Sequence, residues 1–361
     1  MPKTKFINLI LLCGFVISFF ACKQETPDTS SHQSIEFENI TQLKVTQTTD
    51  EICIYNHPNF SIPSLCISQK KLPFTKIVLL TSSPAGYLDQ LNAIDHITAA
   101  YNTEWIYNPT LAQRIQQGLA ANGQNSIVAN YEQILSWQPD LVISSTNPNH
   151  QNLFQQLIHA DIPVILIDEH LENSPLARAE YIKLYGILTG KDKLAQQEFS
   201  HIQEQYHSLS RQATQQSAKP SVFAEIQRGD TWHMPGAHSY LAQLLNDAGA
   251  NYLFTDNTAQ GAIPLSFERV YNTAQNADYW VNAADFHTYQ QLADAHSGHT
   301  LFQAYKNHKV YAIAGRINHT GASDYFESGA VRADLLLADY VKIFHPHLVP
   351  NHTFTYVNAL Q

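Results

Sequence analysis

The sequence predicts an α/β protein with two Rossmann-like lobes, each built on a parallel sheet, joined by a single long bridging α-helix. Three observations predict this fold. Continuous apolar runs of strand length alternate with helical patterns, as in parallel sheets that are covered on both faces. One long amphipathic pattern lies between the two halves of the chain. Both halves also contain the same short motif, which indicates two similar units.

The chain begins with a pattern that is typical of a secretion signal. Lys3 and Lys5 precede an apolar run over residues 6–20, which ends at Ala21 and Cys22. The run is nearer to the apolar core of a signal peptide, about 7–15 residues, than to the about 20 residues of a membrane-spanning helix. We therefore expect a signal peptide over residues 1–21 and a lipid on Cys22. An ordinary secreted protein whose Cys22 carries no lipid is the alternative.

Composition and periodicity suggest where the parts of the mature chain begin and end. Residues 23–33 are rich in Ser, Thr, Gln and Pro and offer little apolar surface to bury. The rest of the chain is long enough for two packed lobes. The predicted parts are a lipid-anchored tether over 22–45, an amino-terminal lobe over 46–172, a connecting helix over 173–190, a bridging helix over 191–215 and a carboxyl-terminal lobe over 216–361.

Two cysteines remain for the exported domain, because Cys13 leaves with the signal and Cys22 would carry the lipid. Cys53 and Cys66 flank the turn-rich residues 56–59, which could fold this segment into a hairpin. In an oxidising compartment the two could form a disulfide. A pair of unlinked thiols is the alternative.

The predicted strands and helices alternate in both lobes, and right-handed crossovers are expected between the parallel strands. In the first lobe the clearest strands are residues 77–80, 141–144 and 164–167, with helices near Leu88, Glu132 and Leu153. In the second lobe the strands are residues 222–226, 279–281 and 310–313, and the helices are residues 239–248, 267–276 and 329–343.

The bridging helix is predicted from the spacing of its apolar residues. Ala195, Phe199, Ile202, Tyr206 and Leu209 recur every three or four residues, which gives one amphipathic helix over about residues 191–211. Such a helix would be about 30 Å long, the width of a small domain. The alternative is a surface helix that belongs to one lobe only.

The motif that both halves share contains an aromatic residue followed by glutamate. Tyr131-Glu132 opens a predicted helix that leads to an Asp-initiated strand, and Phe267-Glu268 does the same in the second half. Local helix chemistry explains the residue types. Asn130 and Ser266 can cap the start of each helix, and an acidic residue in the first turn interacts with the helix dipole, which stabilises the helix by about 0.3–1 kcal/mol. It does not explain why each half has one such motif.

In these features the sequence resembles the periplasmic binding proteins of importers for iron siderophores, haem and cobalamin, the group whose lobes are joined by one rigid helix. The resemblance runs from about Lys76 to the carboxyl terminus. Its carriers are residues 81–85, Glu132 with 139–143, residues 249–250 with 266–268, and residues 333–339 followed by His345-Pro346.

The resemblance implies a monomeric, membrane-anchored lipoprotein of the periplasm that binds a small metal chelate, with an iron siderophore as the expected ligand, and delivers it to an inner-membrane ABC permease. It implies no cofactor and no enzymatic activity. Glu132 and Glu268 match the glutamates that contact permease arginines in this family. Two separated carboxylates would position the protein over the permease and steer its approach.

The ligand would lie between the lobes, on loops that leave the carboxyl ends of the strands. Aromatic side chains suit flat macrocycles or catecholates, and arginines suit anionic oxygens, so haem and cobalamin stay open as ligands. The candidates in the first lobe are Ser83, Tyr87, Tyr101, Trp105 and Asn147. Those in the second lobe are Arg228, Trp232, Met234, His238, Arg316 and Tyr325.

Other functions have weaker support. The formal charge of −10 and the lack of a basic run argue against nucleic acid as a partner. Residues 186–191 resemble a phosphate-binding loop but have the wrong spacing. A direct zinc or manganese site would need ligands from both lobes, and only His238 and His319 are near predicted cleft loops. An exported lipoprotein hydrolase is the enzymatic alternative, but no Gly-x-Ser-x-Gly motif is present.

Overall fold

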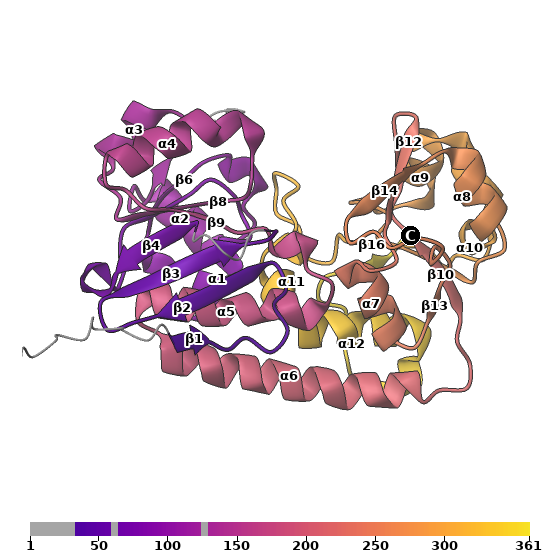
Figure 1. The fold of residues 1–361 in the computed structure, drawn as a ribbon. Helices are drawn as coiled ribbons and strands as arrows, with labels where there is room; N and C mark the ends of the chain where they lie inside the picture. Colours follow the sequence, from indigo (N-terminus) through magenta and orange to yellow (C-terminus); the bar gives the residue numbers. More distant parts are fainter. Residues whose placement is uncertain (1–32, 59–63, 124–128) are drawn as a thin grey trace, which may run out of the picture. The chain divides into compact units, whose positions relative to one another are not determined.

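The computed structural model describes residues 33–58, 64–123 and 129–361, all within the unit His32–Gln361. The amino-terminal lobe contains a five-stranded parallel sheet in the order β7-β6-β5-β8-β9 (Figure 1). Its strands are β5 (Ile77–Leu79), β6 (Ile97–Ala100), β7 (Ala121–Asn122), β8 (Leu141–Ser144) and β9 (Val164–Leu166). Its helices are α1 (Pro84–Gln90), α2 (Pro109–Gln116), α3 (Tyr131–Ser136) and α4 (Gln151–His159).

Alternate residues of these strands pack on opposite faces of the sheet, because side chains in a strand alternate in direction. Val78 and Val142 belong to a buried cluster with Leu153 of α4. Leu79 and Ile143 belong to the other cluster, which includes α1 and the long helices. Both faces are therefore covered, which explains why the strands have continuous apolar sequences.

A four-stranded antiparallel sheet precedes this parallel sheet in the chain. Its strands, in spatial and sequence order, are β1 (Gln33–Ile35), β2 (Leu43–Gln47), β3 (Glu51–Asn56) and β4 (Leu65–Ser68). The prediction of a tether over residues 22–45 is therefore wrong from β1 onward. Leu43 and Val45 of β2 are buried in the main core, and β2 pairs with β3, so this part of the predicted tether is an integral part of the amino-terminal lobe.

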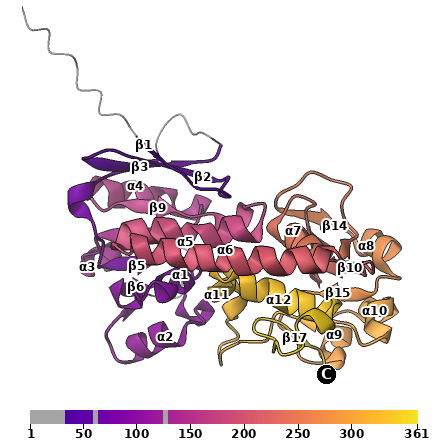
Figure 2. The same cartoon turned by 90° about the horizontal axis from the view of Figure 1, so that it is seen from below.

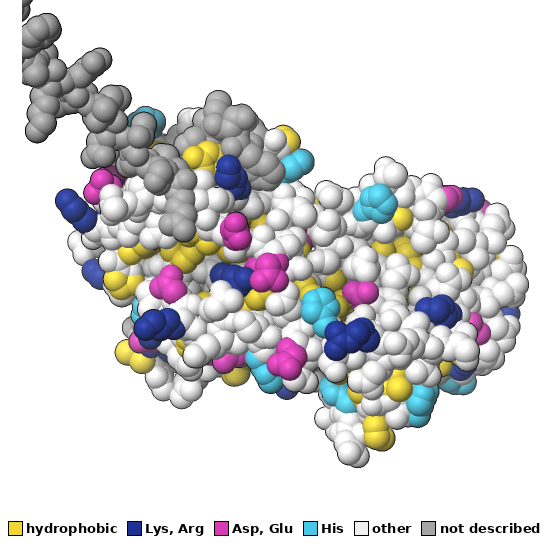
Figure 3. Space-filling model, turned by 60° about the horizontal axis from the view of Figure 1, so that its bottom comes forward, with side chains coloured by type: hydrophobic (Ala, Val, Ile, Leu, Met, Phe, Trp, Pro, Cys, Tyr) yellow, Lys and Arg dark blue, Asp and Glu magenta, His cyan; other side chains and the backbone are white. Residues whose placement is uncertain are grey.

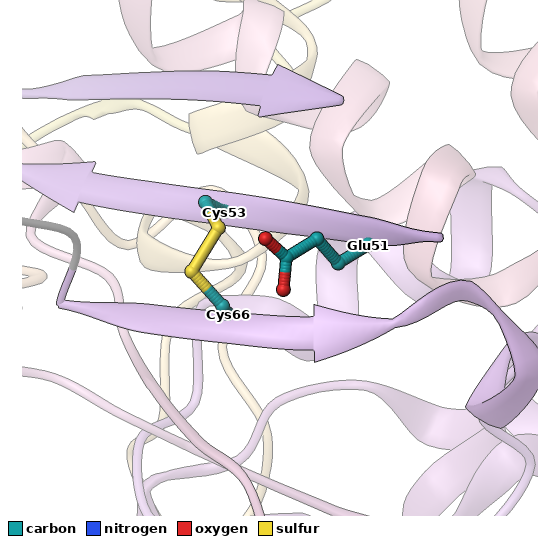
Figure 4. Close-up of side chains that lie close together, drawn as sticks. All are labelled: Glu51, Cys53 and Cys66. Atoms are coloured by element: carbon teal, nitrogen blue, oxygen red, sulfur yellow. A yellow bond between two sulfur atoms is a disulfide. The ribbon is translucent and has the colours of Figure 1, made fainter. Parts of the chain in front are cut away.

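Cys53 and Cys66 face each other across β3 and β4 and are joined by a disulfide (Figure 4). Glu51 lies beside them, and these three residues form a group of potential metal ligands among the described residues. Both sulfur atoms are used by the disulfide, so the group offers no thiolate to a metal.

Two long helices connect the lobes. Helix α5 (Pro175–Thr189) begins at Ser174, whose side chain accepts from the Ala177 N–H, and ends at Gly190 in the left-handed conformation. Helix α6 (Asp192–Thr214) packs against α5 and, farther along, against α7 and α12 (Figures 1 and 2). Its 23 residues span about 35 Å, so the predicted bridging helix is confirmed.

The carboxyl-terminal lobe contains a smaller parallel sheet, in the order β13-β10-β15, and two antiparallel groups. The parallel strands are β10 (Ser221–Ala224), β13 (Asn251–Tyr252) and β15 (Tyr279–Val281). The antiparallel strands are β11 (Gln227–Arg228), β12 (Thr231–Pro235) and β14 (Ala262–Leu265), and β16 (Tyr311–Ala312) with β17 (Asn358–Ala359). The helices are α7 (Tyr240–Asp247), α8 (Phe267–Ala274), α9 (Tyr289–Ala295), α10 (Gln303–Lys306), α11 (Ser328–Val331) and α12 (Ala333–Phe344).

Aromatic side chains fill the core of this lobe. Phe223 stacks on Trp280 and on Phe302 with ring centroids 5.0 Å apart in both pairs, and Trp232 packs beside all three. Trp232 is fully buried, and its indole N–H donates to the Ala224 carbonyl at 3.0 Å. This packing fixes the β11–β12–β14 group against the parallel sheet.

Charged side chains are dispersed on the face drawn in Figure 3, where Lys and Arg alternate with Asp and Glu. This face offers no basic patch of the kind that binds phosphate backbones. Within the described ranges, no helix combines the length and the apolar character that crossing a bilayer requires.

Candidate functional site

The structure places the candidates of the amino-terminal lobe at the carboxyl ends of its strands but buries most of them. Ser83 is the residue before α1 and is buried. Tyr87 is fully buried, and its hydroxyl donates to the Arg178 carbonyl at 2.8 Å. Tyr101 is buried as well and donates to Gln133 Oε1 at 2.7 Å, which holds the start of α3. Tyr87 and Tyr101 therefore pack within the protein, and the structure leaves almost none of either side chain open to a ligand.

Two candidates of this lobe remain accessible. Trp105 is 65% exposed, in the short 3₁₀-helix Thr103–Trp105 that follows β6. Asn147 is half-buried after β8, where its side chain accepts from the Asn149 N–H and starts the next turn. Of this lobe's predicted set, Trp105 is thus the side chain most free to contact a ligand.

The candidates of the carboxyl-terminal lobe divide in the same way. Trp232 and Met234 are fully buried in the core and offer no surface to a ligand; they point inward from β12 because its side chains alternate. Tyr325 is buried as well, and its hydroxyl accepts from Asn282 Nδ2 at 3.1 Å. Arg228 and His238 are exposed.

Arg316, the remaining candidate of this lobe, already has a partner. It forms an ion pair with Asp324 at 3.2 Å, and about half of its side chain stays exposed. Its guanidinium also lies 5.9 Å from the centre of the Tyr356 ring.

The two lobes touch through loops that leave the carboxyl ends of their strands. Tyr107 N–H and Asn108 N–H both donate to the carboxylate of Glu327, which lies about 220 residues away in sequence and is 1% exposed. Asn318 Nδ2 donates to the Ile106 carbonyl at 2.9 Å, and Thr320 Oγ1 donates to the Glu104 carbonyl at 2.7 Å. We call these two segments, residues 104–108 and 318–327, the lobe junction.

Glu327 is an unusual residue for such a contact. Burial is the main cause that raises its pKa to about 8, and the nearby Asp324 and Asp89 raise it further. The hydrogen bonds from the Tyr107 and Asn108 N–H groups act in the opposite direction and lower it. The backbone also approaches closely here, since a Cβ on Gly86 would lie 2.4 Å from the Glu327 carbonyl carbon. Only glycine allows α1 to approach the carboxyl-terminal lobe at this distance.

A second polar cluster lies at the carboxyl ends of β10 and β15. Glu225 and Asn282 follow these strands, and both have positive φ, 65° and 55°, which is costly for residues other than glycine and is common at functional sites. Asn282 Nδ2 faces Glu225 Oε1 at 3.4 Å, and Asn282 Oδ1 accepts from the Tyr340 hydroxyl. Burial raises the pKa of Glu225 to about 7, although the hydrogen bond from Asn282 and the charge of Arg228 both act to lower it.

The predicted permease contacts lie on exposed helix starts. Glu132 and Glu268 are both exposed, each as the second residue of its helix, α3 or α8. The predicted caps are confirmed, since Asn130 accepts from the Gln133 N–H and Ser266 accepts from the Arg269 N–H. Hydrogen bonds from its own backbone and from Ser266 lower the pKa of Glu268. Figure 1 shows α3 and α8 on the same side of the unit, opposite α6.

Sequence reasoning missed Glu327, Glu225 and Arg178. Arg178 lies in α5 and is 4% exposed, with its guanidinium 4.1 Å from the centre of the Tyr240 ring of α7. A charged residue inside the apolar sequence of α5 was the one available signal for it. The two glutamates lie in loops, where an acidic residue is common and no sequence pattern distinguishes a functional one.

Hollows among the described residues lie in the amino-terminal lobe. One of about 410 Å³ lies in the amino-terminal lobe and is lined by Asn56, Thr146, Asp168 and Tyr181 among others. An apolar groove beside β4 and β9 is lined by Leu65, Ile158 and Leu166 among others. Both border residues 59–63, which are outside the described part of the chain, so neither is assigned as a site.

Comparison with known proteins gives the family. Residues 77–316, more than half of the chain, match the model of the periplasmic binding protein family. An uncharacterised lipoprotein of Methanocaldococcus jannaschii is 20% identical over 285 residues, and an uncharacterised protein of the same organism is 23% identical over 227 residues. These matches cover 76% and 62% of this chain, which spans 66% of the length of each of these curated relatives.

Solved structures share the fold at low sequence identity. A possible iron-binding, periplasmic solute-binding protein of Staphylococcus epidermidis is 18% identical, with a TM-score of 0.58 over 76% of this chain and 99% of that one. A periplasmic haem-binding protein of Vibrio cholerae is 17% identical, with a TM-score of 0.57 over 73% and 98%. A protein of Saccharomonospora viridis, whose structure is described as an ABC-type Fe³⁺-hydroxamate transport system, is 14% identical in sequence. Its TM-score is 0.57, over 87% of this chain and 99% of that one.

The predicted α/β architecture with a bridging helix is therefore confirmed by both the structure and these likenesses. The matched family consists of solute-binding proteins rather than enzymes. The chain belongs to the periplasmic binding protein family, with the two-lobed, helix-bridged fold of the substrate-binding proteins that serve ABC importers.

Proposed function

We propose that this protein captures a metal chelate between its lobes and delivers it to an inner-membrane ABC permease. The ligand we propose first is a ferric siderophore. The observation that carries the proposal is the lobe junction. There, loops from the carboxyl ends of strands in both lobes meet, which is where ligands bind in open α/β sheets. The iron-related functions named for its structural neighbours support the same ligand class.

Two exposed guanidinium groups of the carboxyl-terminal lobe suit such a ligand. Arg316 offers a half-exposed guanidinium, and Arg228 is exposed beside Glu225. Guanidinium groups bind anionic oxygens through two parallel hydrogen bonds, and siderophores carry such oxygens around the metal. The ligand would therefore be held by charge-assisted contacts rather than by direct ligation of the metal.

Haem is the second candidate, because two exposed aromatic side chains stand in the lobe junction. Trp105 is 65% exposed and Phe326 is 50% exposed, and their segments contact each other across the lobes. Large apolar side chains at such exposure are suited to stacking on a flat macrocycle. Two of the neighbouring structures are described as haem-binding proteins.

Docking to the permease would use Glu132 and Glu268. Both are exposed, and their helices are on the same side of the unit. Carboxylates on separate rigid lobes can pair with basic residues at fixed positions, which sets orientation and raises the association rate. The exported protein would be held at the membrane by a lipid on Cys22, a residue outside the described part of the chain. Mass analysis of the mature amino terminus would find the lipid or refute it.

Calorimetric titration against ferric siderophores of the hydroxamate, catecholate and carboxylate classes, haemin and cobalamin tests the ligand proposal. We expect saturable one-to-one binding of at least one iron chelate with no product formed. Hydrolysis of ester, peptide or glycoside substrates without chelate binding would overturn it.

A further inference from the structure

The carboxyl-terminal segment, residues 352–361, packs against the loop that carries Arg316, residues 313–321. It follows α12, and its strand β17 pairs antiparallel with β16, which directly precedes the loop. The Gly315 N–H donates to the Tyr356 carbonyl at 3.0 Å, and a Cβ on Gly315 would lie 2.7 Å from the Tyr356 carbonyl carbon. Only glycine allows this approach, so the loop rests on the backbone of the segment.

A buried carboxylate of α12 fixes the carboxyl-terminal segment. Asp339 is 0% exposed and accepts from the backbone N–H groups of residues 355–357 at 2.6 to 3.2 Å. His352 Nε2 also lies 2.6 Å from one of its oxygens. Hydrogen bonds to a charged acceptor are stronger than neutral ones, so this set holds its donors firmly. Tyr356 therefore has a fixed backbone, and its side chain is buried above it.

The side chain of Tyr356 begins a chain of hydrogen bonds that ends at Arg316. Ser328 Oγ lies 3.0 Å from the Tyr356 hydroxyl and donates to Asp324 Oδ2 at 2.7 Å. Because a serine hydroxyl has one proton, the Tyr356 hydroxyl is the donor to Ser328. Burial raises the pKa of Tyr356, which keeps that proton in place. Asp324 in turn pairs with Arg316 at 3.2 Å.

This chain of hydrogen bonds orients a side chain that would otherwise have many conformations. About half of the Arg316 side chain is exposed, and its guanidinium lies 5.9 Å from the centre of the Tyr356 ring. Its backbone is held as well, because the Asp324 N–H donates to the Arg316 carbonyl at 3.0 Å. A long side chain that is ordered before the ligand arrives loses less conformational entropy on binding.

We propose that Tyr356 is a positioning residue of the interlobe site, which acts through Ser328 and Asp324 to hold Arg316 in the orientation that receives the ligand. This inference rests on the proposed function and adds the carboxyl-terminal segment to its site. The match to the periplasmic binding protein family ends at residue 316, so the assignment concerns a part of the chain outside that match.

Tyr356→Phe tests the proposal, because it removes one hydroxyl and keeps the buried ring. Tyr206→Phe is the matched control, since Tyr206 is also buried and donates its hydroxyl to Asp247 at 2.6 Å, where α6 contacts α7. Ferric dicitrate, ferrichrome and haemin are each titrated into the mature forms of wild type, both variants, Arg316→Met and the double variant Arg316→Met/Tyr356→Phe. The thermal midpoint and the hydrogen–deuterium exchange of each free protein are measured in parallel.

We expect Tyr356→Phe to weaken binding of the chelate that wild type prefers by about 3- to 10-fold, the effect of one hydrogen bond, and to speed exchange in residues 313–321. Tyr206→Phe should lower the thermal midpoint by a similar amount but leave the affinity within about 2-fold of wild type. Arg316→Met should also weaken binding, and Tyr356→Phe should add less than about 2-fold in that background, because the side chain that it positions is gone. Ser328→Ala breaks the same chain of hydrogen bonds and replaces Tyr356→Phe if that variant does not fold.

Two kinds of result would overturn the inference while the proposed function stands. One is an affinity that Tyr356→Phe or Arg316→Met leaves unchanged. The other is a loss of the same size in Tyr206→Phe, or an undiminished effect of Tyr356→Phe in the Arg316→Met background, which is what a structural role alone predicts. If wild type binds none of the three chelates and none of the wider panel, the proposed function fails and the inference fails with it.

Discussion

The lobe junction and the helix starts at Glu132 and Glu268 both depend on acidic groups, but they place them in opposite environments. Glu327 is 1% exposed and bonds to backbone N–H groups of the other lobe. Glu132 and Glu268 are exposed and lie in the capped first turns of their helices, where the helix dipole stabilises a carboxylate without any partner. The difference teaches that the buried acid serves the protein's own structure, while the exposed acids are available to a partner.

Reversing the charge of the exposed pair is the strongest way to test this contrast. The double variant Glu132→Lys/Glu268→Lys should reduce chelate uptake in cells to background, because like charges would face the basic residues of the permease. Ligand affinity in solution and the thermal midpoint should stay at the wild-type values. Glu204→Lys, on exposed α6, is the matched control. Normal uptake by the double variant would refute the docking role.

Removing the buried acid should act on stability instead. Glu327→Ala leaves the N–H groups of Tyr107 and Asn108 without their acceptor, and each unsatisfied buried donor costs about 1–3 kcal/mol. We expect urea unfolding to show a loss of about 2–4 kcal/mol in the free energy of unfolding. An unchanged free energy would mean that the junction adds nothing to the stability of the unit.

The raised pKa of Glu327 predicts a specific pH dependence. Its pKa is about 8 in the folded protein and near 4.5 when unfolded, so the folded state retains the proton over this window. Stability should therefore fall as pH rises from about 4.5 to about 8. Glu225 acts in the same direction only up to about pH 7. Between pH 7 and 8 the slope should disappear in Glu327→Gln, and a slope that persists there would contradict the assignment.

Trp105 gives the smallest but most local signal. Trp232 and Trp280 are fully buried and far less open to a ligand than Trp105. If the ligand binds at the lobe junction, it should quench mainly Trp105, and Trp105→Phe should remove most of the fluorescence change on binding. Quenching that is undiminished in this variant would place the ligand elsewhere.

The sequence could predict the features that depend on periodicity. Continuous apolar residues gave β5, β8 and β9, and apolar residues three or four apart gave α6, because burial on two faces or on one stripe leaves these patterns. Of the antiparallel sheet, the sequence indicated only the β3–β4 hairpin; β2 was missed because its five residues, although they alternate as in a strand, directly follow a polar segment. It could be recognised only through its pairing with β3.

The site was harder to predict because composition does not tell a core aromatic residue from a ligand-binding one. Tyr87, Tyr101, Trp232 and Tyr325 follow or occupy strands of the expected kind, yet their polar atoms satisfy buried partners within the protein. Arg178 and Glu327 are defined by contacts with distant residues, which no local pattern records.

Hydrogen–deuterium exchange with and without a saturating chelate tests the central claim most directly. We predict that the ligand slows exchange at the same time in residues 102–108 of the amino-terminal lobe and 313–327 of the carboxyl-terminal lobe, with strands β1–β4 unaffected. Protection confined to one lobe, or centred on the hollows beside β3 and β4, would contradict a site shared by the two lobes.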